Sequence, residues 1–264
     1  MGGRAQSGLT GVTGPGPWTA LGPADAPAIV FVHGTRLTRA QWAPQMRLLA
    51  PRYRCIAVDL PGHGALVGEP FTREAAADVV AAAIAAEAAD GQALVVGLSL
   101  GGYVAIDTAE RHPDRVVGLV LSGCSAEPVG PGALPFRALA SVLDGAPLGP
   151  LDALNRRFFR LRYPARIAGP IIEGGFGQSG GAQALRAIVG GRFLDRLARL
   201  WTPVLIVNGA MDPVFGPSGE TWAASCRRGR SAVIPRAMHL APLDRPRTFS
   251  RLVAEFADEV ARAG

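Results

Sequence analysis

The sequence predicts an α/β fold: a doubly wound, mostly parallel sheet with a helical cap inserted after the strand that ends near Leu121. Two observations lead to this prediction. Short apolar runs recur along the chain with helical segments between them. The runs are continuously apolar rather than alternating, as in strands that helices cover on both faces. Strands that alternate with helices form parallel sheets with right-handed crossovers.

The predicted elements follow one another in a regular order. The strands are the apolar runs 28–32, 55–58, 93–96, 116–121, 204–207 and, more weakly, 232–234. The helices between and after them are 38–50, 72–89, 100–111, 218–226 and 244–263. Thr72 supplies a capping hydroxyl and Pro113 stops the third helix. Ahead of these elements only 18–21 resembles a strand, and we expect residues 1–16 to be disordered.

One interval, residues 125–200, breaks this alternation. It contains no convincing strand, only helical pieces near 136–143, 151–162 and 182–199. An insertion between two sheet strands is expected to cover the carboxyl edge of the sheet, where α/β proteins bind ligands. We therefore expect residues 125–200 to form a helical cap, or lid. The core then consists of residues 17–124 and 201–264.

Composition narrows the class of protein. Hydrophobic residues make up 48% of the 264, which is ample for a core, and no run approaches the ~18 apolar residues of a membrane helix. The first residues lack the apolar stretch of a secretion signal, so we expect a cytoplasmic protein. Cys55, Cys124 and Cys226 are odd in number and far apart, which favours buried free thiols over a disulfide or a metal site.

The charge of +6 does not indicate a nucleic-acid partner. All 27 basic residues are arginine, no basic run exceeds two residues, and none alternates with aromatic residues for base stacking. We expect a small-molecule substrate, no nucleic acid and no membrane partner, and a monomer or homodimer. Residues 125–200 hold ten arginines and five acids, so the substrate is a candidate anion. The alternative, solvated helix faces in an arginine-biased composition, is the more common situation. The candidate substrate contacts are Arg36, Arg156, Arg157, Arg160, Phe158 and Phe159.

The most informative motif is Gly97-Leu98-Ser99-Leu100-Gly101. An apolar strand leads into it and a helical segment leads away, which is the context that holds a nucleophilic serine on a sharp turn above a sheet. A second G-x-S-x-G copy, around Ser179, lies in a glycine-rich stretch with no strand before it and is expected to be a flexible loop. Ser99 is therefore the candidate nucleophile.

A nucleophilic serine needs a base, and the base needs an orienting acid. Of the four histidines, only His239 lies downstream of Ser99 in a loop that follows a strand, so it is the candidate base. Asp212 sits in a turn just beyond the strand 204–207 and is the candidate acid. Asp59 also ends a strand, but its D-x-P-G turn usually engages the carboxylate with backbone amides.

The order Ser99, Asp212, His239, with His33-Gly34-Thr35 upstream and Asp59-Leu60-Pro61-Gly62-His63-Gly64 between, resembles the α/β-hydrolase superfamily. It is most similar to the small capped esterases, lactonases and C–C hydrolases. The resemblance implies an oxyanion hole made by the backbone N–H groups of Thr35 and Leu100, and no cofactor or metal. A serine at position 99 excludes the members with an aspartate nucleophile.

These observations predict a serine hydrolase that cleaves a small ester, thioester or lactone through an acyl-enzyme. Two alternatives stay open on the same fold. The same three residues serve C–C bond hydrolases and cofactor-free lyases or cyclases. A hydrolase-fold protein can also bind a ligand without turning it over, because fold alone does not determine function.

Overall fold

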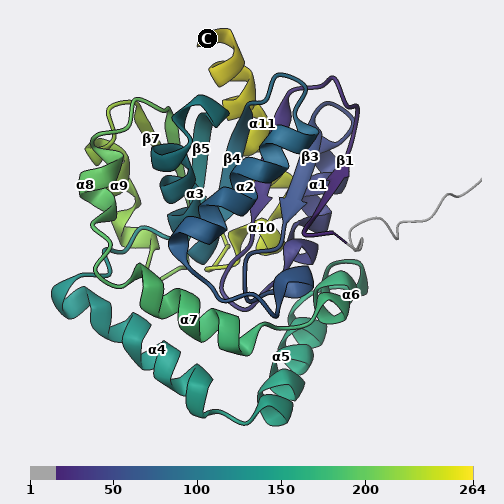
Figure 1. Cartoon of the computed structure of the whole chain (residues 1–264), viewed down its shortest axis with the longest axis vertical. Coiled ribbons are helices and arrows are strands. Elements are labelled where there is room, and N and C mark those ends of the chain that lie inside the picture. Colours follow the sequence, from purple (N-terminus) through teal and green to yellow (C-terminus); the bar gives the residue numbers. More distant parts are fainter. Residues whose placement is uncertain (1–15, 264) are drawn as a thin grey trace, which may run out of the picture.

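The computed structural model describes residues 16–263. The expected disorder of residues 1–16 therefore falls, apart from Gly16, outside the described residues. Within them the strands form one seven-stranded sheet in the order β1-β3-β2-β4-β5-β6-β7 (Figure 1). The strands are β1 Trp18–Leu21, β2 Ala28–Val32, β3 Arg54–Val58, β4 Ala93–Leu98, β5 Val116–Ser122, β6 Val204–Gly209 and β7 Gly229–Ile234.

All neighbouring strands in this sheet are parallel except β1, which pairs antiparallel with β3 at the edge. β2 and β4 are buried along their whole length, as their continuous apolarity predicts. The predicted doubly wound α/β fold is therefore confirmed. The weakest predicted strand, 232–234, is also real and begins three residues earlier.

Helices cover both faces of the sheet. One face packs against α2 (Arg73–Glu87), α3 (Leu100–Arg111) and α9 (Gly219–Ser225), and the other against α1 (Ala43–Leu49) and α11 (Pro246–Ala263). Two predicted helices are divided. The segment 38–50 begins as the 3-10 turn η1 (Arg39–Trp42), and in the segment 244–263 the short helix α10 (Ala241–Asp244) ends at the first residue before α11 begins at Pro246. The remaining short elements are α10 Ala241–Asp244, η1 Arg39–Trp42, η2 Gly64–Leu66, η3 Pro113–Arg115, η4 Gly130–Ala133 and η5 Gly216–Ser218.

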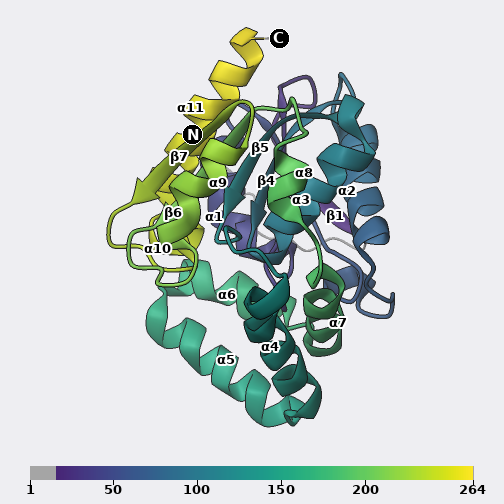
Figure 2. The ribbon, with the colours of Figure 1, turned by 90° about the vertical axis from the view of Figure 1, so that its left-hand side faces the viewer.

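The chain between β5 and β6 is helical and contains no strand in the structure. Its helices are α4 Leu134–Gly145, α5 Leu148–Arg162, α6 Ala165–Gly174, α7 Gln178–Ile188 and α8 Phe193–Leu197. Figures 1 and 2 show α4–α7 gathered at one end of the sheet, opposite the end reached by α11. Because β4 and β5 run toward that end, these helices lie over the carboxyl edge of the sheet.

Three parts of this insertion differ from the sequence predictions. The helical piece predicted at 182–199 is divided into α7, which ends at Ile188, and α8, which begins at Phe193. The helix α6 was not predicted, because Gly169 and Pro170 discourage a helix; Ile167 and Ile171 nevertheless give it a buried face. The expected flexible loop around Ser179 was wrong, since α7 begins at Gln178. A Cβ at Gly180 would lie 2.2 Å from the carbonyl oxygen of Gly62, so the glycines there serve a close backbone approach rather than flexibility.

Candidate active site

Ser99 occupies a sharp turn between the end of β4 and the start of α3. Its backbone has φ 54° and ψ −118°, a conformation that non-glycine residues rarely adopt and that is found most often at functional sites. The neighbouring glycines permit this turn, because a Cβ at Gly97 would lie 2.2 Å from the oxygen of Gly101 and one at Gly101 would lie 2.1 Å from the oxygen of Val32. The local geometry is therefore the one the motif predicts.

His239 and Asp212 meet although 27 residues separate them in the sequence. The ring Nδ1 of His239 lies 3.1 Å from Oδ2 of Asp212. The other carboxylate oxygen of Asp212 accepts the amides of Val214 at 3.0 Å and Phe215 at 3.1 Å. With Nδ1–H donating to the carboxylate, Nε2 of His239 carries the lone pair of a base.

Asp212 is held in its ionised form. Burial raises its pKa, but the hydrogen bonds from His239 and from the Phe215 and Val214 amides outweigh burial and lower the pKa below its usual value. The side chain is only 2% exposed, so its charge faces the imidazole in a medium that screens it weakly. An ionised, buried carboxylate is suited to orient the ring and to stabilise the imidazolium.

Ser99 and His239 line the same cavity, which has a volume of about 660 Å³. Its walls come from the loops after β2, β4, β5, β6 and β7 and from the helices α4 and α7. The wall residues are mostly apolar: Leu37, Leu98, Pro135, Phe136, Leu139, Leu185, Val214, Phe215 and Leu240. An apolar chamber with few polar groups at one end is typical of a small-molecule site.

The loop after β2 lies against Ser99. A Cβ at Gly34 would lie 3.6 Å from Cβ of Ser99. The Gly34 amide donates to Oε1 of Gln41 at 3.0 Å, and the Arg36 amide donates to Nε2 of His63 at 3.3 Å. Between them the Thr35 amide has no partner in the part of the chain that the structure describes. Leu100 begins α3, where amides lack partners within the helix.

His33 and His63 hold this loop rather than act as bases. The Leu60 amide donates to Nε2 of His33 at 3.0 Å, and the Nδ1 atoms of the two rings lie 2.9 Å from the carbonyl oxygens of Gly34 and Pro61, respectively. Burial lowers the pKa of His33 to about 4, and burial together with the His33 charge lowers that of His63 to about 3. Both rings are therefore neutral near pH 7.

Three residues that the sequence analysis missed fix the orientation of the His239 side chain. Phe215 stacks on its ring, with centroids 5.0 Å apart. Gly123 has φ +59°, and a Cβ there would lie 2.8 Å from Cε1 of the ring. Asn208 joins the surrounding loops: its Oδ1 accepts the Gly123 amide at 3.0 Å, and its Nδ2 donates to Phe215 O at 2.9 Å and Ser125 Oγ at 2.8 Å. The asparagine directly after the apolar run 204–207 was the only sequence signal for this role.

The predicted substrate contacts separate into two groups. Arg36 lines the cavity. Arg156, Arg157, Arg160, Phe158 and Phe159 on α5 are not among its lining residues. Phe159 is 4% exposed and stacks between Tyr163 and Phe176 in a small core of the insertion, whereas Phe158 is 47% exposed. The helical period identified the apolar residues of α5 but not which neighbours they pack against.

The remaining sequence expectations have clear positions. Asp59 accepts the amides of Arg39 and Ala65, as expected of its turn. His112 ends α3 and contacts Asp78 at the surface. The three cysteines are free and buried. Ser179 is exposed on α7 and is not among the residues that line the cavity.

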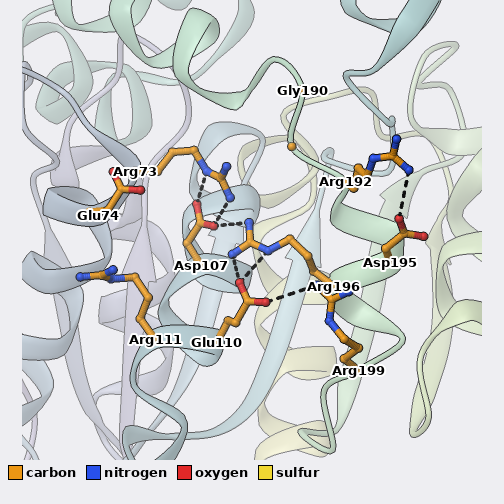
Figure 3. Close-up of a pocket in the computed structure, with 11 residues that line it drawn as sticks. Arg73, Glu74, Asp107, Glu110, Arg111, Gly190, Arg192, Asp195, Arg196 and Arg199 are labelled. Atoms are coloured by element: carbon orange, nitrogen blue, oxygen red, sulfur yellow. Dashed lines mark hydrogen bonds and ion pairs between the residues drawn. The ribbon is translucent and has the colours of Figure 1, made fainter.

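A second pocket, of about 450 Å³, lies between α2, α3 and α8 (Figure 3). Its centre is Asp107, which Arg73 and Arg196 both contact; the Nε of Arg73 donates at 2.9 Å. The same two guanidinium groups lie 5.0 and 5.4 Å from the ring centre of Phe193. Its lining residues include no serine, cysteine or histidine. This pocket is an ion-pair cluster that fastens α8 to α3.

The fold, with a strained serine after β4 and an Asp–His pair beside it, is that of an α/β hydrolase. Residues 29–252 match the sequence pattern of the alpha/beta hydrolase family, and the chain belongs to this family. The resemblance seen in the sequence is thereby confirmed. Within residues 16–263, no helix combines the length and apolarity needed to cross a membrane.

Known relatives narrow the class further. The chain is 31% identical to the pimeloyl-[acyl-carrier protein] methyl ester esterase of Neisseria meningitidis serogroup C / serotype 2a over 249 residues, covering 88% of this chain and 94% of that one. It is 28% identical to the bifunctional esterase/perhydrolase DCH of Acinetobacter calcoaceticus, covering 89% and 93%. A thermophilic esterase from Thermogutta terrifontis, solved with malate bound, aligns with a TM-score of 0.76 and 26% identity, covering 92% and 93%. The chain is thus an ester-cleaving α/β hydrolase.

Proposed function

We propose that the chain cleaves a small carboxylic ester, thioester or lactone through an acyl-enzyme at Ser99, with His239 as the base and Asp212 as its orienting acid. The observation that carries this proposal is the hydrogen-bonded Asp212–His239 pair at a cavity whose wall includes Ser99. The strained backbone of Ser99 supports it, because such strain persists where it presents a reacting group.

The mechanism follows from the atoms that face the cavity. Nε2 of His239 takes the Ser99 hydroxyl proton as Oγ attacks the substrate carbonyl. The proton then passes to the leaving oxygen or sulfur, and the acyl group stays on Ser99. Water, deprotonated by the same ring, attacks the acyl-enzyme. The ring then returns that proton to Oγ of Ser99 as the bond to the acyl carbon breaks and the acid leaves. Asp212 keeps Nδ1 protonated throughout and stays ionised itself.

The negative oxygen of each tetrahedral intermediate would be held by the amides of Thr35 and Leu100. Removing one such preorganised donor typically costs about 3–4 kcal/mol of transition-state stabilisation. Support comes from the contacts of the loop, since the Gly34 and Arg36 amides on either side of Thr35 are engaged. Leu100 adds the partial positive charge of the α3 N-terminus.

The insertion would act as the cap of this site. Pro135, Phe136 and Leu139 of α4 and Leu185 of α7 form part of the cavity wall, so α4 and α7 would shape the acyl pocket and limit the access of water. The buried free cysteines support a reducing compartment, and we place the enzyme in the cytoplasm on that ground.

The decisive experiment compares two serines that share the same motif. Hydrolysis of 4-nitrophenyl acetate and butyrate is measured for the wild type, Ser99→Ala and Ser179→Ala. We expect kcat/KM to fall by at least about 10⁴-fold in Ser99→Ala and to stay within about twofold in Ser179→Ala. Turnover retained by a folded Ser99→Ala enzyme would refute the proposal.

A further inference from the structure

Arg36 is a half-buried arginine with an unusual backbone conformation. It follows Thr35 directly and has φ 67°, a left-handed conformation that is uncommon for a non-glycine residue. Glycine or asparagine would adopt this conformation more easily. The chain nevertheless has a long cationic side chain here, on the wall of the cavity that Ser99 and His239 line.

The guanidinium of Arg36 has unused donors. Nη1 donates to Oδ1 of Asn155 on α5 at 3.4 Å, a long hydrogen bond. Nε and Nη2 are shielded from solvent and have no hydrogen-bond partner within residues 16–263, and neither has Nδ2 of Asn155. Buried donors without partners are unfavourable by about 1–3 kcal/mol each. Three such donor nitrogens, two of Arg36 and one of Asn155, belong to side chains in contact with each other.

Within residues 16–263, the positive charge of Arg36 also has no carboxylate in direct contact. Burial lowers the pKa of Arg36, and the field of Asp152 opposes that shift. The carboxylate of Asp152, however, pairs with Arg156 at 3.6 Å rather than with Arg36. Glu127 lines the same cavity, but its two oxygens accept the amides of Phe193 and Leu194. The acidic groups nearest to the site are thus engaged elsewhere.

Another arginine of the chain, Arg73, shows which group the Nε and Nη2 atoms of a guanidinium bind. In the second pocket, Nε and Nη2 of Arg73 grip the two oxygens of Asp107 side by side (Figure 3). This two-bond arrangement matches the planar fork of a guanidinium to a carboxylate. In Arg36 the same two nitrogens are the ones without partners. These two donors of Arg36 match a carboxylate in the same way.

We propose that Arg36 binds a free carboxylate of the substrate through Nε and Nη2 while the ester carbonyl lies at Ser99. The preferred substrates would then be monoesters of short dicarboxylic acids, or lactones and thioesters that carry a carboxylate. This inference rests on the proposed function and names the substrate class of that site. Arg36 would be a specificity residue, since it contacts the substrate away from the reacting atoms.

Binding can be measured without turnover. In the Ser99→Ala background, calorimetry compares mono-4-nitrophenyl glutarate with 4-nitrophenyl pentanoate, a neutral ester of similar length. We expect the anionic ester to bind at least about tenfold more tightly, and Arg36→Gln to remove that advantage. Equal affinities in the Ser99→Ala protein would overturn the inference, whatever the catalytic role of Ser99.

Kinetics on the enzyme with Ser99 intact supply the second readout. The ratio of kcat/KM for the anionic ester to that for the neutral ester should fall about 10–100-fold in Arg36→Gln, through KM. Arg36→Lys keeps the charge but loses the fork, so an intermediate ratio is expected. Arg137→Gln on α4 removes an exposed positive charge near the cavity without altering its lining and should keep the ratio.

The outcomes separate this inference from the proposed function. If Arg137→Gln lowers the ratio as much as Arg36→Gln does, the preference comes from the overall positive field and the inference fails. If the wild type hydrolyses both esters equally and Arg36→Gln does the same, the inference fails while the esterase stands. If neither ester is hydrolysed but the anionic ester binds through Arg36, the inference stands and the proposed function fails.

Discussion

The pocket around Asp107 and the cavity around Ser99 both contain charged groups, but these groups are paired within the protein only in the first. Around Asp107, two partly exposed guanidinium groups, Arg73 and Arg196, contact the same buried carboxylate. Around Ser99 the backbone is strained, a histidine Nε2 is left for a reacting proton, and Arg36 keeps donors without partners. In the Asp107 pocket the charges are paired within the protein, and this pairing stabilises the fold. In the Ser99 cavity the His239 Nε2 and the Arg36 donors are left for a ligand.

Asp212 and Asp107 are a matched pair for testing this contrast, because both are buried aspartates. Asp212→Asn should lower kcat for ester hydrolysis by about 10³–10⁴-fold, since the amide favours the wrong tautomer of His239. Its Oδ1 equivalent can still accept the amides of Val214 and Phe215, so the melting temperature should move little. Steady-state kinetics measure the fall in kcat, and a thermal melt checks that the melting temperature is unchanged. A kcat within tenfold of the wild type would contradict the assignment of Asp212.

Asp107→Asn should show the reverse pattern. It leaves the partly exposed guanidinium groups of Arg73 and Arg196 close together without their shared anion, which should lower the free energy of unfolding by about 1–3 kcal/mol. Urea denaturation measures the loss. For the fraction that stays folded, kcat/KM should lie within about threefold of the wild type. A stable but inactive variant would assign this pocket a direct part in the reaction.

Acidification should weaken the loop beside Ser99, because His33 and His63 are held neutral in the folded chain. The folded-state pKa values of about 4 for His33 and about 3 for His63 lie below the value of 6.5 of a free histidine. Between pH 6.5 and 4 the unfolded chain binds protons that the folded chain does not, so stability falls as pH falls. Each ring contributes up to about 1.4 kcal/mol per pH unit, which amounts to about 3 kcal/mol between pH 6.5 and 5.

Urea denaturation at pH 7.0, 6.0 and 5.0 tests this dependence. In His63→Gln the fall in stability should be smaller by up to about 1.4 kcal/mol per pH unit, because one titrating ring is gone. Burial raises the pKa of Asp107 to about 6, so Asp107 takes up a proton in the same range with the opposite effect on stability, and Asp107→Asn should steepen the fall. A stability that is constant from pH 7 to pH 5 would show that the two rings are not held neutral.

The smallest predicted effect isolates the strain at Ser99. Glycine adopts φ 54° without the steric clash of a Cβ, whereas alanine retains it. Ser99→Gly should therefore be more stable than Ser99→Ala by about 1 kcal/mol, after the larger backbone entropy of unfolded glycine is included. Paired urea denaturation curves measure the difference. An alanine variant at least as stable would mean that the turn carries no strain.

Much of this architecture could be predicted from the sequence for physical reasons. Strands buried on both faces are continuously apolar, so β2 and β4 were predicted within two residues of their observed ends. The candidate base emerged by elimination, because a chain with four histidines offers few alternatives. Helix α6 escaped prediction because local propensity opposes it and only tertiary packing supports it.

The finer structure of the site depends on contacts between distant segments, which no local pattern encodes. Asn208 of β6 contacts Gly123 and Ser125 at the end of the neighbouring strand β5, and Phe215 after β6 stacks on His239 after β7. Arg36 could be named as a candidate from its place beside Thr35. Its unpartnered nitrogens become visible only when α5 is packed against the loop.

The measurement that tests the central assignment most directly is the mass-spectrometric mapping of a fluorophosphonate adduct on the intact enzyme. Our account predicts one modified peptide, with the phosphonyl group on Ser99, and no labelling after His239→Ala. An adduct on Ser179 or on any other residue, or none on a folded wild-type enzyme, would contradict it.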